Sequence, residues 1–313
     1  MTQSKREILL ATSRGLFAAD RTGAVAFDGR DVNALTVSRN TLLAVVDRHE
    51  LWRASDGAPE APERWTRFGT LADEVSCLLE RDGAVWIGTE GAHLYRLPAL
   101  QGAEESPVEP VDAFESHPDR ERWYTPWGGP PAVRSVSATA DGDLFVNVHV
   151  GGVLRSSDEG ASWTQTIDIG IDVHQVLALD RPPLVLAPTG KGFAVSADRG
   201  SSWSVATEGL DFRYMRAVTV AGDTIFASAS DGPHGSRGAV YRRPIGSDQP
   251  FERCVHGLPE WFGGNVDTFC LQTAEHAVVI GSPEGSVFVS EDQGEHWDQV
   301  VAGLPAIRAV SVR

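Results

Sequence analysis

Short apolar runs recur along the whole chain, and clusters of Gly, Asp and other turn-forming residues separate them. Runs of about five apolar and β-branched residues between such clusters are typical of β-strands joined by hairpins. One kind of run recurs seven times: VNALTV (32–37), VSCLLE (75–80), VRSVSA (133–138), VHQVLA (173–178), MRAVTV (215–220), VDTFCL (266–271) and IRAVSV (307–312). Helical periodicity is almost absent, so the pattern predicts an all-β chain.

Further runs follow each of these and complete a repeating unit. A second run comes next in six units: LLAVV (42–46), VWIGT (85–89), LFVNV (144–148), LVLAP (184–188), IFASA (225–229) and VVIGS (278–282). Two more strands follow it, and four strands in about 40 residues describe one blade of a propeller. ILLAT (8–12) lacks a first-type run before it, and IRAVSV lacks a second-type run after it.

We therefore predict a seven-bladed β-propeller in a single domain, 1–313, whose N- and C-terminal strands share one blade. Such closure leaves no sheet edge exposed. Six blades is the alternative, if the longer segment at 103–131 misleads the count.

Three turns share the spacing S-x-D-x-G-x-x-W: SSDEGASW (156–163), SADRGSSW (196–203) and SEDQGEHW (290–297). This motif resembles the Asp-box of the BNR repeat found in sialidase-like propellers. We interpret the hairpin as structural, because Ser and Asp side chains bond to turn backbone and Gly adopts positive φ. The Trp is expected to fill the space beneath the hairpin. The motif covers three turns, whereas the propeller pattern covers nearly the whole chain.

The resemblance implies a site that holds a carboxylate with three arginines, as in sialidases, beside a Tyr–Glu pair and an acidic acid–base. Arg134, Arg216 and Arg308 are similar to the arginine part. Other features depart from sialidases: ATSRGLF replaces the Arg-Ile-Pro segment near the N-terminus, and seven blades replace six. The motifs therefore predict a relative that is not a true sialidase.

The second residue of each first strand is expected to face the central channel. These positions hold Asn33, Ser76, Arg134, His174, Arg216, Asp267 and Arg308. Guanidinium groups bind carboxylate, phosphate and sulfate in two-pronged fashion, so three converging arginines indicate an anion site. The alternative is a solvated channel mouth without a ligand.

Second-strand ends reach the same face and bring further candidate chemistry. His149 and His174 belong to neighbouring blades, and a His pair suits acid–base catalysis or binding of a divalent metal ion. Glu90 and Asp267 would supply oxygen ligands, so we predict His149, His174, Asp267 and Glu90 as catalytic residues, the first two as tentative metal ligands. The alternative is that each His is a hydrogen-bonded wall residue.

Two long connections are also expected on this face. The segment 103–131 is predicted to be an inserted lid-like loop, and LPEWFGGN (258–265) is a second insert. Long loops with aromatic residues often form binding walls. The candidate wall residues are His117, Trp123, Tyr124, Trp127, His234 and Trp261. The alternative is that these side chains pack onto their own blades.

The net charge of −16 argues against nucleic acid and anionic membranes as partners. The apolar run at the N-terminus is too short for a signal peptide, and the three cysteines are scattered, so we expect a cytoplasmic protein. We predict an enzyme, hydrolase-like or lyase-like, that acts on a small organic anion in the channel. The alternative is a non-catalytic scaffold or assembly factor that binds a protein partner.

Overall fold

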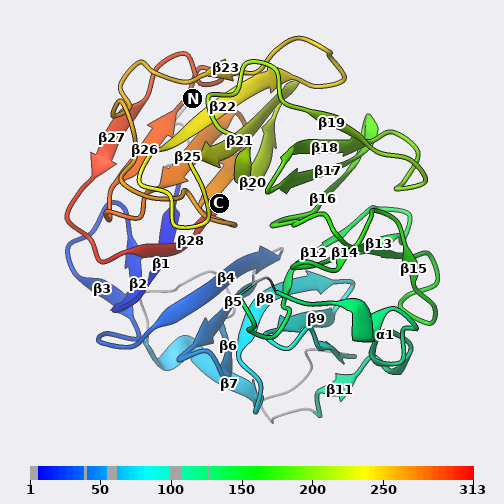
Figure 1. Ribbon diagram of the computed structural model, residues 1–313. Helices are drawn as coiled ribbons and strands as arrows, with labels where there is room; N and C mark the ends of the chain where they lie inside the picture. Colours follow the sequence, from blue (N-terminus) through cyan, green and yellow to red (C-terminus); the bar gives the residue numbers. More distant parts are fainter. Residues whose placement is uncertain (1–5, 39–40, 55–61, 99–106, 126) are drawn as a thin grey trace.

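A computed structural model describes residues 6–38, 41–54, 62–98, 107–125 and 127–313. This part of the chain folds into seven four-stranded antiparallel sheets arranged around a ring (Figure 1). The predicted seven-bladed β-propeller is therefore confirmed. None of the helices in the described ranges is long and apolar enough to span a bilayer.

Each blade begins with an innermost strand at the channel and continues outward through three more. The first blade holds β28 (Ile307–Val312), β1 (Ile8–Thr12), β2 (Gly15–Ala18) and β3 (Ala24–Ala26). The second blade holds β4 (Val32–Ser38), β5 (Thr41–Val46), β6 (Glu50–Ala54) and β7 (Trp65–Thr70). The third holds β8 (Val75–Arg81), β9 (Ala84–Thr89), β10 (Leu94–Leu97) and β11 (Glu109–Pro110). The fourth holds β12 (Val133–Ala138), β13 (Leu144–Val148), β14 (Gly152–Ser156) and β15 (Thr164–Gln165). The fifth blade holds β16 (Leu177–Asp180), β17 (Pro183–Thr189), β18 (Gly192–Ser196) and β19 (Ser204–Ala206). The sixth holds β20 (Tyr214–Ala221), β21 (Thr224–Ser230), β22 (Gly238–Pro244) and β23 (Glu252–Arg253). The seventh holds β24 (Leu271–Ala274), β25 (Ala277–Gly281), β26 (Val287–Ser290) and β27 (Asp298–Val301).

The two ends of the chain close the ring within one blade, as predicted. Strand β28 pairs antiparallel with β1, and Leu10 lies opposite Val310. Backbone hydrogen bonds between Glu7 and Arg313 extend this ladder, at 2.9 and 3.0 Å. Glu7 and the C-terminal Arg313 are thereby tied into one sheet, and the innermost strand of that blade has a partner.

The hydrophobic core lies between the faces of neighbouring blades. Strands in the second position, such as β9 and β25, are buried along their whole length because both of their faces meet another blade. For example, Leu43 and Val45 of β5 pack in one cluster with Val85 and Ile87 of β9. This explains why the second-type runs in the sequence are continuously apolar rather than alternating.

The three S-x-D-x-G-x-x-W turns join third to fourth strands and share one hydrogen-bond pattern. In the first, the Ser156 hydroxyl donates to Asp158 at 2.8 Å and accepts from the Gly160 N–H at 2.8 Å. Gly160 has φ of 88°, and Trp163 is buried with its indole N–H donating to the Gly160 carbonyl at 3.2 Å. The side chains are occupied within the turn, which agrees with a structural role.

The predicted lid segment contains several elements. Besides β11, it includes the short helix α1 (Asp112–Glu115) and the 3-10 turn η2 (Arg120–Arg122). Another 3-10 turn, η1 (Pro62–Arg64), lies outside this segment and directly precedes β7. Its residues 103–106 and 126 lie outside the described residues. Since β11 is the outermost strand of its blade, the segment begins as part of a sheet and leaves it only after Pro110.

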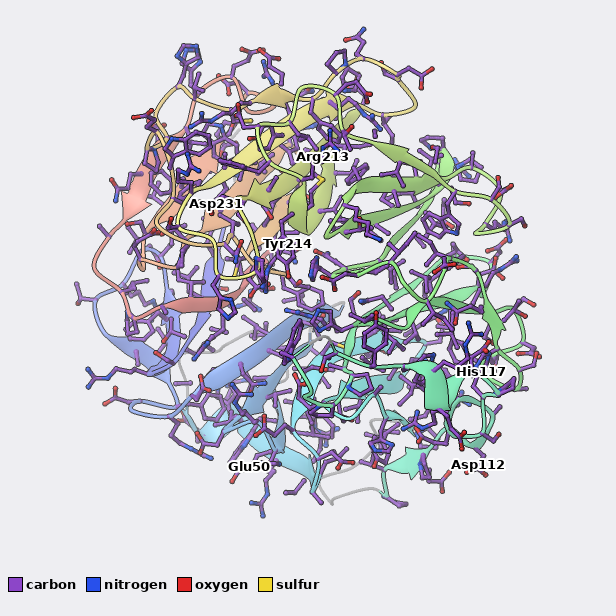
Figure 2. The ribbon with its side chains drawn as sticks, in the orientation of Figure 1. Glu50, Asp112, His117, Arg213, Tyr214 and Asp231 are labelled. Atoms are coloured by element: carbon purple, nitrogen blue, oxygen red, sulfur yellow. The ribbon has the colours of Figure 1, made fainter. Side chains whose placement is uncertain are left out.

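The middle of this segment lies toward the rim of the ring. Figure 2 shows Asp112 and His117 near the outer edge of the molecule, whereas Tyr214 lies near its centre. Phe114, the buried residue of α1, packs against Trp123 and Trp163 with ring centroids 5.4 Å apart in each case. This part of the segment therefore packs onto the blades instead of covering the channel.

Candidate functional site

β-Bulges direct side chains of the innermost strands into the channel. The pairing register shifts between Val32 and Ala34, between Val75 and Cys77, and at the corresponding points of β12, β20 and β28. The residues at the shifts are Asn33, Ser76, Arg134, Arg216 and Arg308. A bulged residue is left out of the ladder and its side chain is re-aimed, as is common beside active sites.

The remaining two channel positions differ from the prediction. His174 and Asp267 were expected as second residues of strands, but β16 begins only at Leu177 and β24 only at Leu271. In the first case the Val176 N–H bonds to the hydroxyl of Ser135 on the neighbouring blade, at 2.8 Å. In the second, the Cys270 N–H bonds back to the Asp267 carbonyl at 2.9 Å and forms a turn. Both side chains therefore lie on the connections that lead into their strands.

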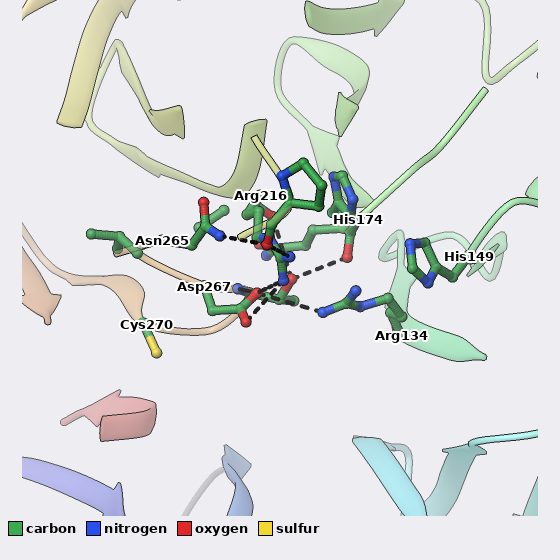
Figure 3. A network of polar contacts seen from close by, with 12 residues as sticks. Arg134, His149, His174, Arg216, Asn265, Asp267 and Cys270 are labelled. Carbon is green, nitrogen blue, oxygen red and sulfur yellow. Dashed lines mark hydrogen bonds and ion pairs between the residues drawn. The ribbon is translucent and has the colours of Figure 1, made fainter. Parts of the chain in front are cut away.

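An arginine pair and one carboxylate meet at the channel mouth (Figure 3). Arg216 Nη1 lies 3.0 Å from each oxygen of Asp267, and Arg134 Nη2 lies 3.5 Å from one of them. Arg216 also donates to the Pro233 carbonyl at 3.1 Å. Although burial opposes ionisation, the two guanidinium groups lower the pKa of Asp267 to about 2. The carboxylate is thus ionised at neutral pH, and 44% of its side chain is exposed to solvent.

A cavity of about 160 Å³ opens beside these groups. Its lining comprises Asn33, Arg48, Val75, Ser76, Glu90, Arg134, Asp267, Thr268, Phe269 and Arg308. Phe269 also lines a second, more apolar cavity of about 280 Å³ farther along the inner strands. Phe269 therefore borders both the charged mouth and an inner cavity that is lined by aliphatic and uncharged polar side chains.

Two of the residues that line the cavity, Asn33 and Ser76, also form hydrogen bonds to the backbone of a neighbouring blade. The Asn33 amide donates to the Val75 carbonyl at 2.7 Å, and the Ser76 hydroxyl donates to the Val133 carbonyl. These contacts join adjacent blades around the ring. The charged residues of the lining, together with Arg216 on Asp267, are left as the groups that define the chemistry of the mouth.

A second polar cluster lies in the channel wall beside the arginines. His149 Nε2 lies 2.8 Å from Asp172 Oδ1, and His174 Nε2 lies 3.3 Å from Asp172 Oδ2. His149 and His174 are buried, and their ring centroids are 5.4 Å apart. The predicted proximity of the two histidines is thus observed, and the three residues offer two imidazole nitrogens and one carboxylate.

Burial and charge set the protonation of this cluster. The pKa of His174 is lowered to about 4, chiefly by burial; Asp172 opposes this shift, and Arg134 and Arg216 add to it. For Asp172, burial favours the neutral acid, but the two imidazoles hold its pKa well below the usual range. The wall therefore presents a carboxylate between two imidazoles.

Asp172 was missed at the sequence level. It precedes His174 by two positions in IDVHQV, on a connection between blades, and nothing in its local pattern marks it. Tyr214 was not chosen either, although its ring lies 4.7 Å from that of His174 and beneath the Arg216 guanidinium.

Other predicted residues are distributed between the mouth and the rest of the blades. Glu90 and Arg308 line the cavity, and Arg308 approaches Asp31 at 3.7 Å. Trp127 is 61% exposed, and its ring lies 5.0 Å from that of His149. Tyr124 is exposed on the same segment. This part of the predicted lid therefore lies over the His149 side of the site.

None of the six predicted wall residues belongs to the lining of the cavity, and four of them also lie away from the His149 side of the site. His117 and Trp123 are buried and stack on each other, with centroids 6.0 Å apart. Trp261 packs against Phe212 and the Arg253 guanidinium, and His234 is exposed on its loop. For the first three, the alternative of packing on their own blades describes the structure better.

A larger open cleft of about 700 Å³ lies at the outer rim, between the β20–β23 and β24–β27 blades. Arg242, which lines it, is already paired with Glu252 at 2.9 Å and Glu295 at 2.8 Å. Because its cation is satisfied by flanking carboxylates, this cleft is a weaker candidate than the channel mouth.

Solved structures with similar folds include enzymes and binding proteins. No protein-family profile and no curated protein sequence matches the chain. An ancestral GH74 enzyme is 14% identical with a TM-score of 0.63, over 87% of this chain and 38% of its own. The WD40 propeller domain of Doa1 is 11% identical with a TM-score of 0.64, over 97% and 88%.

YCF48 from Cyanidioschyzon merolae is 14% identical with a TM-score of 0.60, over 88% of this chain and 87% of its own. These likenesses show the fold alone. The chain spans about two fifths of the length of the GH74 enzyme.

Proposed function

We propose that this propeller is an enzyme, hydrolase-like or lyase-like, that acts on a small organic anion held at the channel mouth. The observation that carries the proposal is the convergence of Arg134 and Arg216 from different blades on Asp267, which lines the cavity, beside a largely buried His–Asp–His cluster. Guanidinium groups would hold a carboxylate or phosphate, and the cluster would supply acid–base or metal chemistry.

The size and charge of the mouth favour a small substrate. The neighbouring solved structures include a GH74 xyloglucanase, an enzyme named for a polysaccharide. A cavity of about 160 Å³ lined by three arginines and two carboxylates suits a compact charged molecule better than a neutral chain of sugars. Asp267 would be the internal carboxylate that an incoming anion displaces from Arg134, where its contact is longest.

Thermal-shift measurements against a panel of small carboxylates and phosphates test the proposal. We expect at least one anion to stabilise the protein, and Arg134→Ala and Arg216→Ala to abolish that stabilisation. Arg199→Ala is the matched control, because Arg199 also pairs with two carboxylates, Asp141 and Asp143, but lies in a turn at the opposite face. Ligand-induced shifts that persist in both channel variants would exclude the mouth as the binding site.

A second candidate function is binding of a partner protein without catalysis. It is favoured by the exposure of Tyr124 and Trp127 on one segment above the mouth, and by a solved neighbour described as YCF48 bound to a D1 peptide. Aromatic side chains of this kind often anchor protein interfaces. Loss of partner binding in Trp127→Ala, with small-anion stabilisation absent from the wild type, would favour this function.

A further inference from the structure

The position of the proton on His174 is set by a backbone carbonyl. Its Nδ1 lies 2.6 Å from the Met215 carbonyl oxygen, which can only accept a hydrogen bond. Nδ1 therefore carries the proton, and in the neutral imidazole Nε2 carries a lone pair. Metal-binding histidines in proteins are commonly oriented by the same kind of contact at the other ring nitrogen.

That lone pair faces another acceptor. His174 Nε2 lies 3.3 Å from Asp172 Oδ2, and among the described residues it has no hydrogen-bond partner. Two acceptors that face each other in a buried wall are unfavourable unless a cation lies between them. The His174 side chain is fully buried, so bulk water does not relieve this contact.

His149 repeats the arrangement from the neighbouring blade. Its Nε2 lies only 2.8 Å from Asp172 Oδ1, yet neither atom has a partner in hydrogen-bond geometry within the described part of the chain. The carboxylate oxygen is close to the ring nitrogen but does not lie along the direction of a ring N–H. The two imidazole nitrogens and the carboxylate thus lie close together without hydrogen bonds between them.

We infer that His149 Nε2, His174 Nε2 and one oxygen of Asp172 form a binding site for one divalent transition-metal ion. The inference deepens the proposed function, on which its role in catalysis rests. The three ligand atoms lie within 4.8 Å of one another. Bonds of about 2.1 Å to a single ion place ligand atoms about 3.4 Å apart in a tetrahedral site. The His174–Asp172 contact of 3.3 Å is close to this spacing, whereas the His149–Asp172 contact of 2.8 Å would have to lengthen when an ion binds.

The ligand set selects the class of metal. Two imidazoles and one carboxylate suit Zn²⁺ and its first-row neighbours, whereas Ca²⁺ and Mg²⁺ prefer oxygen ligands. Three protein ligands leave at least one coordination position for water or substrate, as in catalytic rather than structural zinc sites. Gly190 leaves room for the carboxylate, since a Cβ there would lie 3.0 Å from Asp172 Oδ2.

The metal would also change the net charge of the mouth. The charged side chains nearest the cluster are the guanidinium groups of Arg134 and Arg216 and the carboxylates of Asp172 and Asp267, and as two cations and two anions they sum to zero. One divalent ion makes the wall positive by two charges. An anionic substrate that contacts both the metal and an arginine would neutralise this excess, which joins the metal site to the anion site.

Titration calorimetry of chelator-treated protein with Zn²⁺ tests the inference without any organic ligand. We expect one Zn²⁺ per chain, and at least about 100-fold weaker binding in His149→Gln and Asp172→Asn, because losing a direct ligand costs more than losing an outer-shell partner. Co²⁺ bound to the wild type should give visible absorption bands that are missing from both variants. His296→Gln is the control, since His296 forms an exposed His–Asp pair at 2.9 Å in a turn on the other face.

The near-ultraviolet circular dichroism of the tryptophans shows whether each variant is folded. If only one of the two variants folds, its Zn²⁺ affinity alone tests whether the cluster binds the metal. The inference is overturned if the wild type takes up no stoichiometric Zn²⁺, or if a folded His149→Gln or Asp172→Asn binds it as tightly as the wild type. Arg134→Ala should retain Zn²⁺ binding while losing anion binding. A failed metal site and a failed anion site therefore give different results.

Discussion

Replacing Asp267 by Asn tests whether the channel arginines bind an external anion. The substitution keeps the size of the side chain but removes its charge, so Arg134 and Arg216 lose the carboxylate that they contact at 3.5 and 3.0 Å. Two effects of opposite sign should follow. The folded protein should become less stable, and its affinity for small carboxylates should rise because the guanidinium groups no longer have an internal competitor.

The pKa of Asp267 gives the size of both effects. Lowering it from 3.8 to about 2 corresponds to roughly 2.4 kcal/mol, at about 1.36 kcal/mol for each pH unit. Because 44% of the side chain is exposed, solvent screens the interaction, and we reduce the value to about 1 kcal/mol. The same free energy corresponds to about fivefold tighter binding of an external carboxylate.

The depressed pKa also determines the pH dependence. The carboxylate contributes its stabilisation above its unfolded-state pKa near 3.8, and the contribution is lost as the pH falls toward 2. Urea denaturation should therefore show the Asp267→Asn variant about 1 kcal/mol less stable than the wild type at pH 7, and the difference should shrink as the pH falls from about 4 toward 2. Calorimetric titration with small carboxylates at pH 7 measures the affinity. Equal stability at pH 7 together with unchanged affinity would refute this account of the mouth.

Two further outcomes test the fold. In urea denaturation, Trp163→Ala should reduce the free energy of unfolding by about 3 kcal/mol, because the buried indole packs edge-on against Phe114 with centroids 5.4 Å apart. Trp203 occupies the equivalent turn but is only half-buried, so Trp203→Ala should reduce the free energy of unfolding by less. The three cysteines are buried, and burial raises the pKa of Cys77 and of Cys254 to about 12, so an aromatic disulfide reagent at pH 8 should titrate none in the native protein and three after unfolding.

The blade count could be predicted because each strand carries its own local signal. Second strands such as 85–89 are apolar throughout, since both faces meet neighbouring blades, and hairpin turns separate them from the next strand. Closure could also be predicted, because 8–12 and 307–312 each lacked one complementary strand. The residues at which β16 and β24 begin could not be predicted. They depend on side chains and turns that bind backbone N–H groups in place of a neighbouring strand, as the Ser135 hydroxyl binds the Val176 N–H.

The site could be predicted only where strand register determined it. Arg134 and Arg216 were found because equivalent positions in successive blades face one channel, although the bulges that re-aim them leave no mark in the sequence. Asp172 lies outside the strand pattern, and its approach to His149 depends on how two blades pack. The packing of the segment that carries His117 and Trp123 is equally nonlocal, since it is held by Phe114, which contacts the distant Trp163 as well as Trp123.

The net charge of −16 and the arginine-lined mouth act at different distances. Repulsion between the acidic surface and an approaching anion is screened beyond about 8 Å at physiological ionic strength, whereas guanidinium contacts act at hydrogen-bond range. A small anion that enters the mouth leaves most of the acidic surface outside this screening distance. A polyanion that spans the surface would meet many carboxylates at once, so we expect the same molecule to admit small anions and to exclude nucleic acids.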